Sequence, residues 1–125
     1  MELNPDLDLD VDLHNLTNEL KRLSLLLYRY YKHKAKLEAV RDLAKAVLKE
    51  TRAEVYKEIK SDNTTKHTEN WIESKQDTDP RVMDAQRKLI RAEHDAETWV
   101  GAVDSMKAKK DMLIQITADA RKERQ

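Results

Sequence analysis

Histidines and carboxylates are the side chains of this 125-residue chain with the most obvious chemical potential, and their spacing forms no catalytic or metal-binding set. A di-iron helical bundle needs a glutamate three residues before a histidine on facing helices, and no histidine here has one. Glu93 and Glu97 lie near His94, but charged residues beside a histidine are ordinary on an exposed helix face. We therefore expect neither an enzyme nor a metal site. The four histidines are His14, His33, His67 and His94.

The composition removes several other kinds of site. The chain has no cysteine, which excludes disulfides, thiolate metal ligands and a cysteine nucleophile. It has one glycine, so the glycine-rich loops that bind ATP or dinucleotides are absent, and we expect no cofactor. We find no signal peptide and no run of about 18 apolar residues, the length that a membrane span needs. The expected location is the cytoplasm, the host cell cytoplasm if a phage encodes the protein, with no membrane partner.

The distribution of charge points to a partner. Lys plus Arg number 24, as do Asp plus Glu, and this zero net charge taken alone argues against nucleic acid. Counted by segment, residues 1–20 carry six acids and no Lys or Arg, whereas residues 21–36, the basic block, carry six bases and no acid. Arg22, Arg29 and Lys36 are seven residues apart in this block and would form one ridge on a helix. The aromatic residues interleaved with them are Tyr28, Tyr30, Tyr31 and His33.

Bases that neutralise phosphates, beside rings on which nucleobases stack, are what a sequence-tolerant single-strand site requires. We therefore predict DNA contact by the basic block and, further along the chain, by Lys49 and Arg52. The alternatives are a solvated helix face whose tyrosines pack at a helix interface and, near Arg52, ion pairs within the helix. A third basic cluster, within residues 107–124, also suits the negative end of a helix dipole. The predicted DNA-binding residues are Lys21, Arg22, Tyr28, Arg29, Tyr31, Lys32, His33, Lys36, Lys49 and Arg52.

Residues 1–12 form a predicted acidic, flexible arm, in which Asp alternates with Leu or Val over residues 6–12. Period two suits a strand, but four aspartates disfavour a paired strand. Three roles stay open for the arm: imitating a phosphate backbone at the basic block, docking a partner protein, or simply solvating the chain.

A long helix must carry the basic block. Apolar residues recur in steps of three and four over residues 13–55, which predicts a helix over about 13–60. Asp12 is the expected N-cap, and Asp10 is close enough to favour the positive end of the helix dipole. Leu25 and Leu26 lie off the main apolar stripe.

A second apolar stripe predicts a helix over about 80–121. Asp79 can cap it, and Pro80 suits its first turn, where no backbone N–H is needed. Between the two helices, at about 61–79, polar residues predict a loop and a short helix near residues 66–74. The polar exceptions in the second stripe are Lys110 and Thr117.

The chain is therefore expected to be all-α, with two long antiparallel amphipathic helices in a helical hairpin or coiled coil and a short helix between them. Residues 13–125 would form a single domain. Such a hairpin has little interior, and residues 23–27 are apolar around most of the helix, so we expect a homo-oligomer. Packing of the bundle within one chain is the alternative. The expected oligomerisation residues are Leu20, Leu23, Leu25, Leu26, Leu27, Tyr30, Trp99, Val103, Met106 and Leu113.

Three stretches share their order of apolar, acidic and basic positions with a known family. The strongest is residues 102–109, followed by Leu113 and Ile116, and the others are residues 79–82 and the aromatic and basic segment 28–33. Over residues 13–121 the chain thereby resembles the phage UvsY-like recombination mediators, small proteins that load a RecA-type recombinase onto single-stranded DNA.

The resemblance implies a helical homo-oligomer, a ring such as a heptamer, that binds single-stranded DNA in recombination and DNA repair. Its implied partners are a RecA-type recombinase and a single-strand-binding protein, and its action would be non-catalytic, gathering many weak phosphate contacts into a strong one. In the family a Lys-x-Arg-Leu segment near the end of the first long helix contacts DNA. Arg52 matches that arginine, whereas Glu50 stands where the lysine would be and Lys49 is displaced by one residue.

A function of another class stays open from the sequence. The same helices suit a structural or chaperone-like coiled-coil assembly protein without nucleic-acid binding, such as a prefoldin-type subunit or a phage scaffold protein. A prefoldin-type chain would place a β-hairpin between its helices. Residues 61–78 have no run of alternating β-branched residues to build one.

Overall fold

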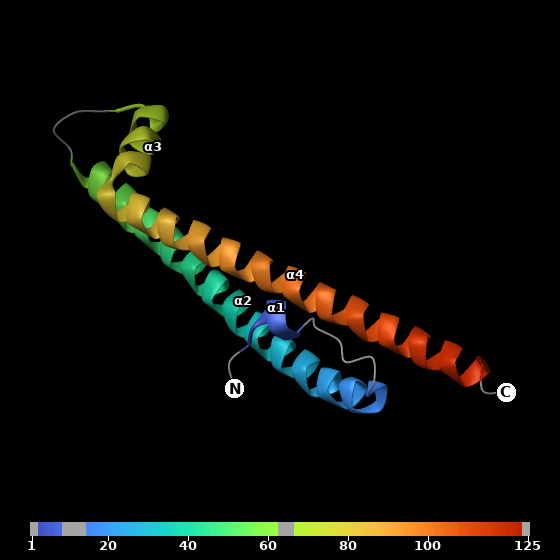
Figure 1. Ribbon diagram of the computed structural model, residues 1–125. Coiled ribbons are helices and arrows are strands. Elements are labelled where there is room, and N and C mark those ends of the chain that lie inside the picture. Colours follow the sequence, from blue (N-terminus) through green and yellow to red (C-terminus); the bar gives the residue numbers. More distant parts are fainter. Residues whose placement is uncertain (1–2, 9–14, 63–66, 124–125) are drawn as a thin grey trace. The chain divides into compact units, whose positions relative to one another are not determined.

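The computed structural model describes residues 3–8, 15–62 and 67–123. Their elements are α1 (Pro5–Asp8), α2 (Leu16–Ser61), α3 (Glu69–Thr78) and α4 (Pro80–Glu123), as labelled in Figure 1. The described residues contain no strand. The predicted all-α class, with two long helices and a short one between them, is confirmed.

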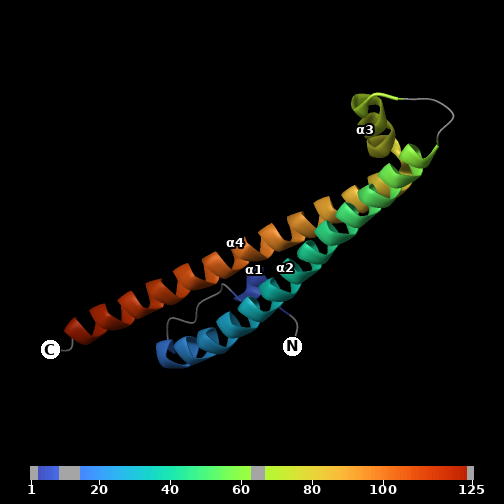
Figure 2. The same cartoon turned by 180° about the vertical axis from the view of Figure 1, so that it is seen from behind.

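Contacts between residues divide the chain into two units, one of residues 1–36 and 97–125 (unit 1) and one of residues 37–96 (unit 2). Both α2 and α4 continue through both units, so each unit holds a piece of each long helix (Figure 2). Within each unit, residues late in one helix piece contact residues early in the other. The two pieces therefore run antiparallel in each unit, as predicted.

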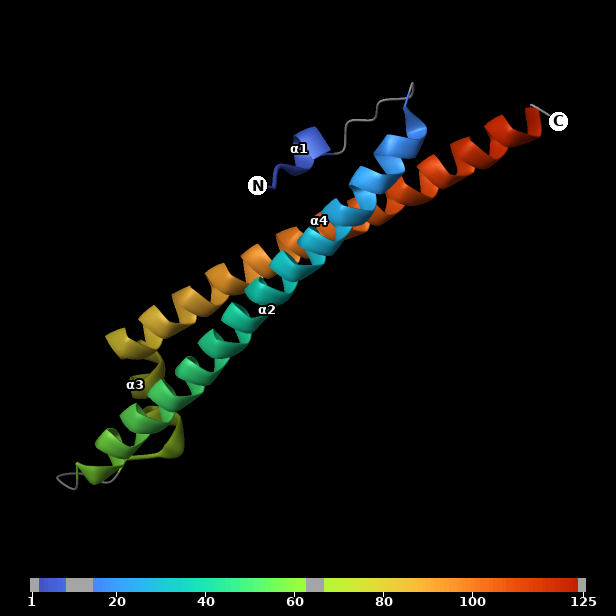
Figure 3. The same cartoon turned by 90° about the horizontal axis from the view of Figure 1, so that it is seen from below.

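Unit 1 has a core formed by three residues of α2 and three of α4. Leu16, Leu20, Leu27, Trp99 and Ala102 pack around it, and Leu3 joins them from the chain before α1. Figure 3 shows α1 as a separate short helix beside the first half of α2. The buried residues of this core are Leu23, Leu26, Tyr30, Val103, Met106 and Leu113.

The placement of two leucines corrects the predicted apolar stripe. Leu26 lies in the core of unit 1, although we expected it off the main stripe, and Leu27 is only half-buried. Leu25 is 51% exposed. The buried positions Leu23, Leu26 and Tyr30 follow steps of three and four, so Leu26 takes the place of Leu27 on the stripe, whereas Leu23 and Tyr30 lie on it as predicted.

Unit 2 has its own small core. Leu48 and Val55 of α2 pack with Val82 and Ala85 of α4, and Ile59 and Leu89 adjoin them. Helix α3 contributes one buried side chain, Ile72. These contacts hold the end of α2 and the start of α4 together.

The start of α4 forms as predicted. The Asp79 side chain accepts a hydrogen bond from the backbone N–H of Arg81 at 2.9 Å. The backbone carbonyl of Asp79 accepts a hydrogen bond from the backbone N–H of Met83 at 3.0 Å. Pro80 is the first helical residue, where its missing N–H costs nothing. Asp79 is therefore the N-cap of α4, and the predicted boundary is confirmed.

The other predicted boundaries fall partly outside the described residues. Asp10, Asp12 and Leu13 lie outside them, so the predicted cap at Asp12 has no structural outcome. The short helix α3 begins at Glu69 and ends at Thr78, later than expected, because the Thr68 hydroxyl caps it by accepting from the N–H of Trp71 at 3.3 Å. Across the described part of the chain, no helix is long and apolar enough to cross a membrane.

Candidate nucleic-acid interface

The basic block lies on the unit 1 piece of α2 and exposes a set of lysines and tyrosines. Lys21, Lys32 and Lys36 are exposed. Tyr28 is 60% exposed and Tyr31 is 38% exposed. Two rings and several ammonium groups are therefore available to solvent on this part of α2.

Lysine ammonium groups lie over both exposed tyrosine rings. The Nζ of Lys32 is 5.5 Å from the ring centroid of Tyr28. The Nζ atoms of Lys34 and Lys107 are 5.9 Å and 5.1 Å from the ring centroid of Tyr31. The pKa of Lys107 is raised mainly by a hydrogen bond with Tyr31 and to a smaller extent by Coulomb attraction, so the ammonium form is favoured. The tyrosine faces and the positive charges thus occupy the same surface.

Two aromatic residues of the basic block instead face the interior. Tyr30 is fully buried, and its ring meets Trp99 edge-to-face at a centroid distance of 5.3 Å. His33 is half-buried and packs against the same tryptophan at 4.2 Å. His33, which we predicted to contact DNA, is therefore partly engaged with Trp99 inside unit 1. Tyr28 and Tyr31 are the rings in this block with exposed surface for stacking.

The predicted arginine ridge is partly engaged within the protein. The Nη2 of Arg22 lies 3.4 Å from Glu19, and its Nη1 lies 4.0 Å from Asp8. Arg29 is half-buried, and Lys36 at the end of the ridge is exposed. The open positive charge of the block is therefore carried by lysines more than by the arginines.

Lys49 and Arg52, the other predicted DNA contacts, lie in unit 2. Lys49 is exposed, whereas the guanidinium of Arg52 lies 3.8 Å from Asp77. The carbonyl of Arg52 accepts a hydrogen bond from the side chain of Gln76 at 2.6 Å. The Nε of Arg52 is buried without a hydrogen-bond partner among the described residues. Arg52 thus helps to hold α3 against α2.

A shallow pocket adjoins these two residues. It has a volume of about 260 Å³ and is lined by Leu48, Leu89 and three basic side chains. The two groups of predicted DNA-binding residues belong to different units. The basic side chains of the pocket are Lys45, Lys49 and Arg52.

A buried polar cluster in unit 1 was not predicted from the sequence. The Oη of Tyr30 donates a hydrogen bond to the Asp8 carboxylate at 2.6 Å. Burial is the larger cause, and this hydrogen bond the second, that holds the pKa of Tyr30 well above its usual range. The Nζ of Lys109 donates to the backbone carbonyl of Asp8 and lies 3.9 Å from Glu19. The Lys109 side chain is 3% exposed.

The burial of Lys109 corrects the predicted stripe of α4, which placed Lys110 at this position. Lys109 follows Met106 by three residues and precedes Leu113 by four, which is core spacing. The sequence contained this signal, but Lys109 looked like one member of a basic cluster. Lys110 is half-buried.

Most predicted oligomerisation residues are used within the chain. Leu23, Leu26, Tyr30, Val103, Met106 and Leu113 form the core of unit 1, and Leu20, Leu27 and Trp99 adjoin it. Their burial is accounted for within one chain. Leu25 is the member of this set that stays largely exposed.

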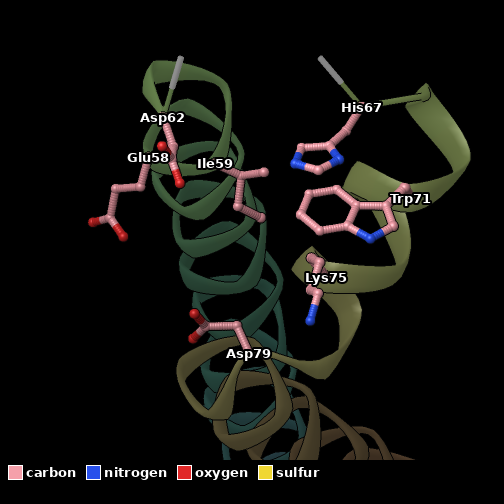
Figure 4. Close-up of a pocket in the computed structure, with 7 residues that line it drawn as sticks. All are labelled: Glu58, Ile59, Asp62, His67, Trp71, Lys75 and Asp79. Atoms are coloured by element: carbon pink, nitrogen blue, oxygen red, sulfur yellow. The ribbon is translucent and has the colours of Figure 1, made fainter. Parts of the chain in front are cut away.

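The end of α2 and helix α3 form a second pocket, in unit 2 (Figure 4). His67 stacks on Trp71 at a centroid distance of 3.5 Å, and the Nζ of Lys75 is 5.5 Å from the Trp71 ring. Ile59 faces this aromatic pair across the pocket (Figure 4). The remaining lining residues are acidic, so the pocket is a poor place for a phosphate: Glu58, Asp62 and Asp79.

Comparison with protein families, curated proteins and solved structures finds no match for this chain. The described residues also contain no group of three or more His, Cys, Asp or Glu side chains placed to hold a metal ion. The exposed tyrosines and lysines of the basic block form the candidate interface.

Proposed function

We propose that this protein is a single-stranded DNA-binding recombination mediator that helps to load a RecA-type recombinase onto DNA without catalysing a reaction. The observation that carries the proposal is the exposed pair Tyr28 and Tyr31, flanked by lysines, in a helical stretch of residues 21–36 that contains no acid. The resemblance to UvsY-like mediators supplies the recombinase and a single-strand-binding protein as partners.

The chemistry of this surface suits single-stranded DNA. Exposed lysines neutralise phosphates, and each phosphate contact releases counterions. Tyrosine faces stack on unpaired bases of any sequence, typically contributing about 1–3 kcal/mol per base. Lys32 and Lys107 keep positive charge within 5.5 Å of the two ring centroids. A base on either ring would therefore bring its phosphate close to an ammonium group.

The neutral net charge implies that one protomer binds modestly. A homo-oligomer, which we infer from the resemblance, would place several such surfaces along one strand and raise the effective concentration of each contact. A strand held in this way is extended and available to the recombinase, while the competing single-strand-binding protein loses its contacts.

The rival function is a coiled-coil assembly protein without nucleic-acid binding. The described residues between α2 and α4 comprise helix α3 and a few non-helical residues beside it, and no β-hairpin occurs among them. This weighs against a prefoldin-type subunit, whose helices would be joined by such a hairpin. A phage scaffold protein would show no affinity for DNA.

The decisive measurement is binding of a labelled oligonucleotide as a function of salt. We expect binding without sequence preference, with log affinity falling by about 0.7 per phosphate contact for each log unit of salt. The variant Lys21→Glu, Lys32→Glu and Lys36→Glu should lose about tenfold or more in affinity at low salt and show a shallower slope. No binding by the wild-type protein at low salt would overturn the proposal.

A matched control reverses three exposed bases of unit 2. Lys57→Glu, Arg87→Glu and Lys88→Glu change the net charge by the same amount, so an equal loss of affinity would mean that the basic block is not the site. The mediator role needs a second assay, in which the protein shortens the lag of recombinase filament growth on strands coated with single-strand-binding protein. If the protein binds DNA but does not shorten this lag, the mediator role is rejected and only DNA binding is retained.

A further inference from the structure

We propose that residues 3–8, the N-terminal segment, are a built-in competitor of DNA that occupies Arg22 and Lys109 and must leave before those bases can meet phosphate. The inference rests on the proposed function and adds its regulation. The segment contacts both long helices in unit 1.

Asp8 is the centre of these contacts. Its carboxylate accepts from the Tyr30 hydroxyl at 2.6 Å and lies 4.0 Å from the Nη1 of Arg22. Its backbone carbonyl accepts from the ammonium of Lys109. Asp8 therefore engages α2 through Tyr30 and Arg22, and it engages α4 through Lys109. With these contacts in place, Asp8 is buried, with 8% of its surface exposed.

One hydrogen bond within the segment fixes its shape, and one apolar contact holds it against unit 1. The backbone N–H of Asn4 donates to the carboxylate of Asp8 at 3.2 Å, which closes the short helix α1. Leu3 packs against the apolar core of unit 1. An apolar anchor thus precedes the buried acid, so the segment is docked at both ends of its described length.

The docked segment covers the ammonium group of Lys109 and places the Asp8 carboxylate beside Arg22, whose side chain is 38% exposed. The Lys109 side chain is 3% exposed and shares Glu19 with Arg22. A buried ammonium is costly without partners, so Lys109 is held by the Asp8 carbonyl and the Glu19 carboxylate. With the segment docked, a phosphate can neither reach Lys109 nor approach Arg22 without meeting the carboxylates of Asp8 and Glu19.

The competition is between like chemical groups. The Asp8 carboxylate and a DNA phosphate are both anions that accept from the same bases. Because the segment belongs to the same chain, it competes at a high effective concentration, and free anions in solution compete less well. A DNA strand already bound at the exposed lysines of the basic block has the same advantage, so it can displace the segment.

Docking is tested without DNA by the reactivity of lysines toward an acetylating reagent, followed by mass spectrometry. We expect Lys109 in the wild-type chain to react at least tenfold more slowly than the exposed Lys107. In the variant Leu3→Ser, Asp8→Ala, which lacks the anchor and the acid, Lys109 should approach the rate of Lys107. Equal rates in the wild-type chain would overturn the inference and leave the proposed function untouched.

Competition is tested by oligonucleotide binding of the same variant. Release of Arg22 and Lys109 should raise affinity several-fold at low salt and steepen the salt slope by about 0.7 for each additional phosphate that the protein neutralises. The control Asp111→Ala removes one exposed acid of α4 and should show only the small increase in affinity that the charge change gives. Equal affinity of the double variant and this control would overturn the inference.

A second variant covers the case in which the double variant does not fold, as judged by circular dichroism. Asp8→Asn keeps an acceptor for Tyr30 and removes the charge beside Arg22, so affinity should rise above that of Asp111→Ala while helicity is unchanged. An affinity no higher than that of the control would count against competition. Absence of binding by every form of the protein at low salt would instead reject the proposed function itself.

Discussion

Single residues decide how the charge of this chain is used. The sequence presents Asp8 and Glu19 as part of an acidic block and Lys109 as part of a basic cluster. In the structure these three residues meet Arg22 and Tyr30 in one polar cluster beside the core of unit 1. Part of the acidic arm is therefore a packed element of the fold.

Arg81 is a second residue whose contacts reach beyond its own helix. Its guanidinium donates to Glu58 of α2 at 3.0 Å and to Asp79 at 3.2 Å. The hydrogen bonds from Arg81 hold the pKa values of the Glu58 and Asp79 carboxyl groups below their usual range. Arg81 therefore favours the ionised form of both carboxyl groups in the folded chain.

The variant Arg81→Gln should weaken the dependence of stability on acid pH. Because the folded pKa values are lowered, the unfolded chain binds more protons, and the stabilisation is present above about pH 5 and lost as pH falls through the folded pKa values. Thermal unfolding followed by circular dichroism between pH 7 and pH 3 measures this. Wild type should lose more stability over that range than the variant, and parallel losses would contradict the prediction.

Among the helices, α4 shows most clearly what local sequence rules achieve. Its start follows from Asp79 and Pro80, and its apolar residues supply half of the core of unit 1. Gly101 is a poor helix former in the interior of α4. A Cβ added at Gly101 would meet nothing within 4 Å, so no neighbouring atom requires a glycine there.

Gly101→Ala should stabilise the protein by about 1 kcal/mol, because alanine has less conformational entropy to lose in a helix. The expected rise in melting temperature is about 4 °C. The reverse change at an exposed alanine of the same helix, Ala108→Gly, should lower stability by a similar amount. A lower melting temperature for Gly101→Ala would mean that another surface packs against this position.

For the molecule as a whole, the neutral charge and the exposed apolar residues set the expected behaviour. Three of the six leucines that we expected to join copies together are buried in unit 1, and Leu20 and Leu27 pack against them. Large apolar side chains are exposed elsewhere, and three of them follow steps of three and four on the unit 2 piece of α2. These are Val40, Leu43 and Val47, exposed by 49%, 66% and 43%.

We expect self-association of the chain through this stripe. A second copy is the partner that we expect, because its α2 presents the same spacing, as the seam of a helix pair requires. Sedimentation velocity should give a mass above that of a monomer, and Leu43→Ser with Val47→Ser should reduce it without loss of helicity. The exposed pair Met83→Ser and Ile90→Ser on α4 is the control, and a monomeric wild-type protein would contradict the prediction.

The sequence by itself determined the all-α class, the two long helices, the start of α4 and the composition of the basic block. Each of these depends on residues within a few positions of one another, where helical spacing and capping rules apply. The apolar stripe also included Tyr30, which the structure places in the core. Only the tertiary structure decided that Lys109 faces inward and that Asp8 meets both Tyr30 and Lys109. Asp8 is 22 residues from Tyr30 and 101 residues from Lys109, and the packing of α1, α2 and α4 in unit 1 brings them together.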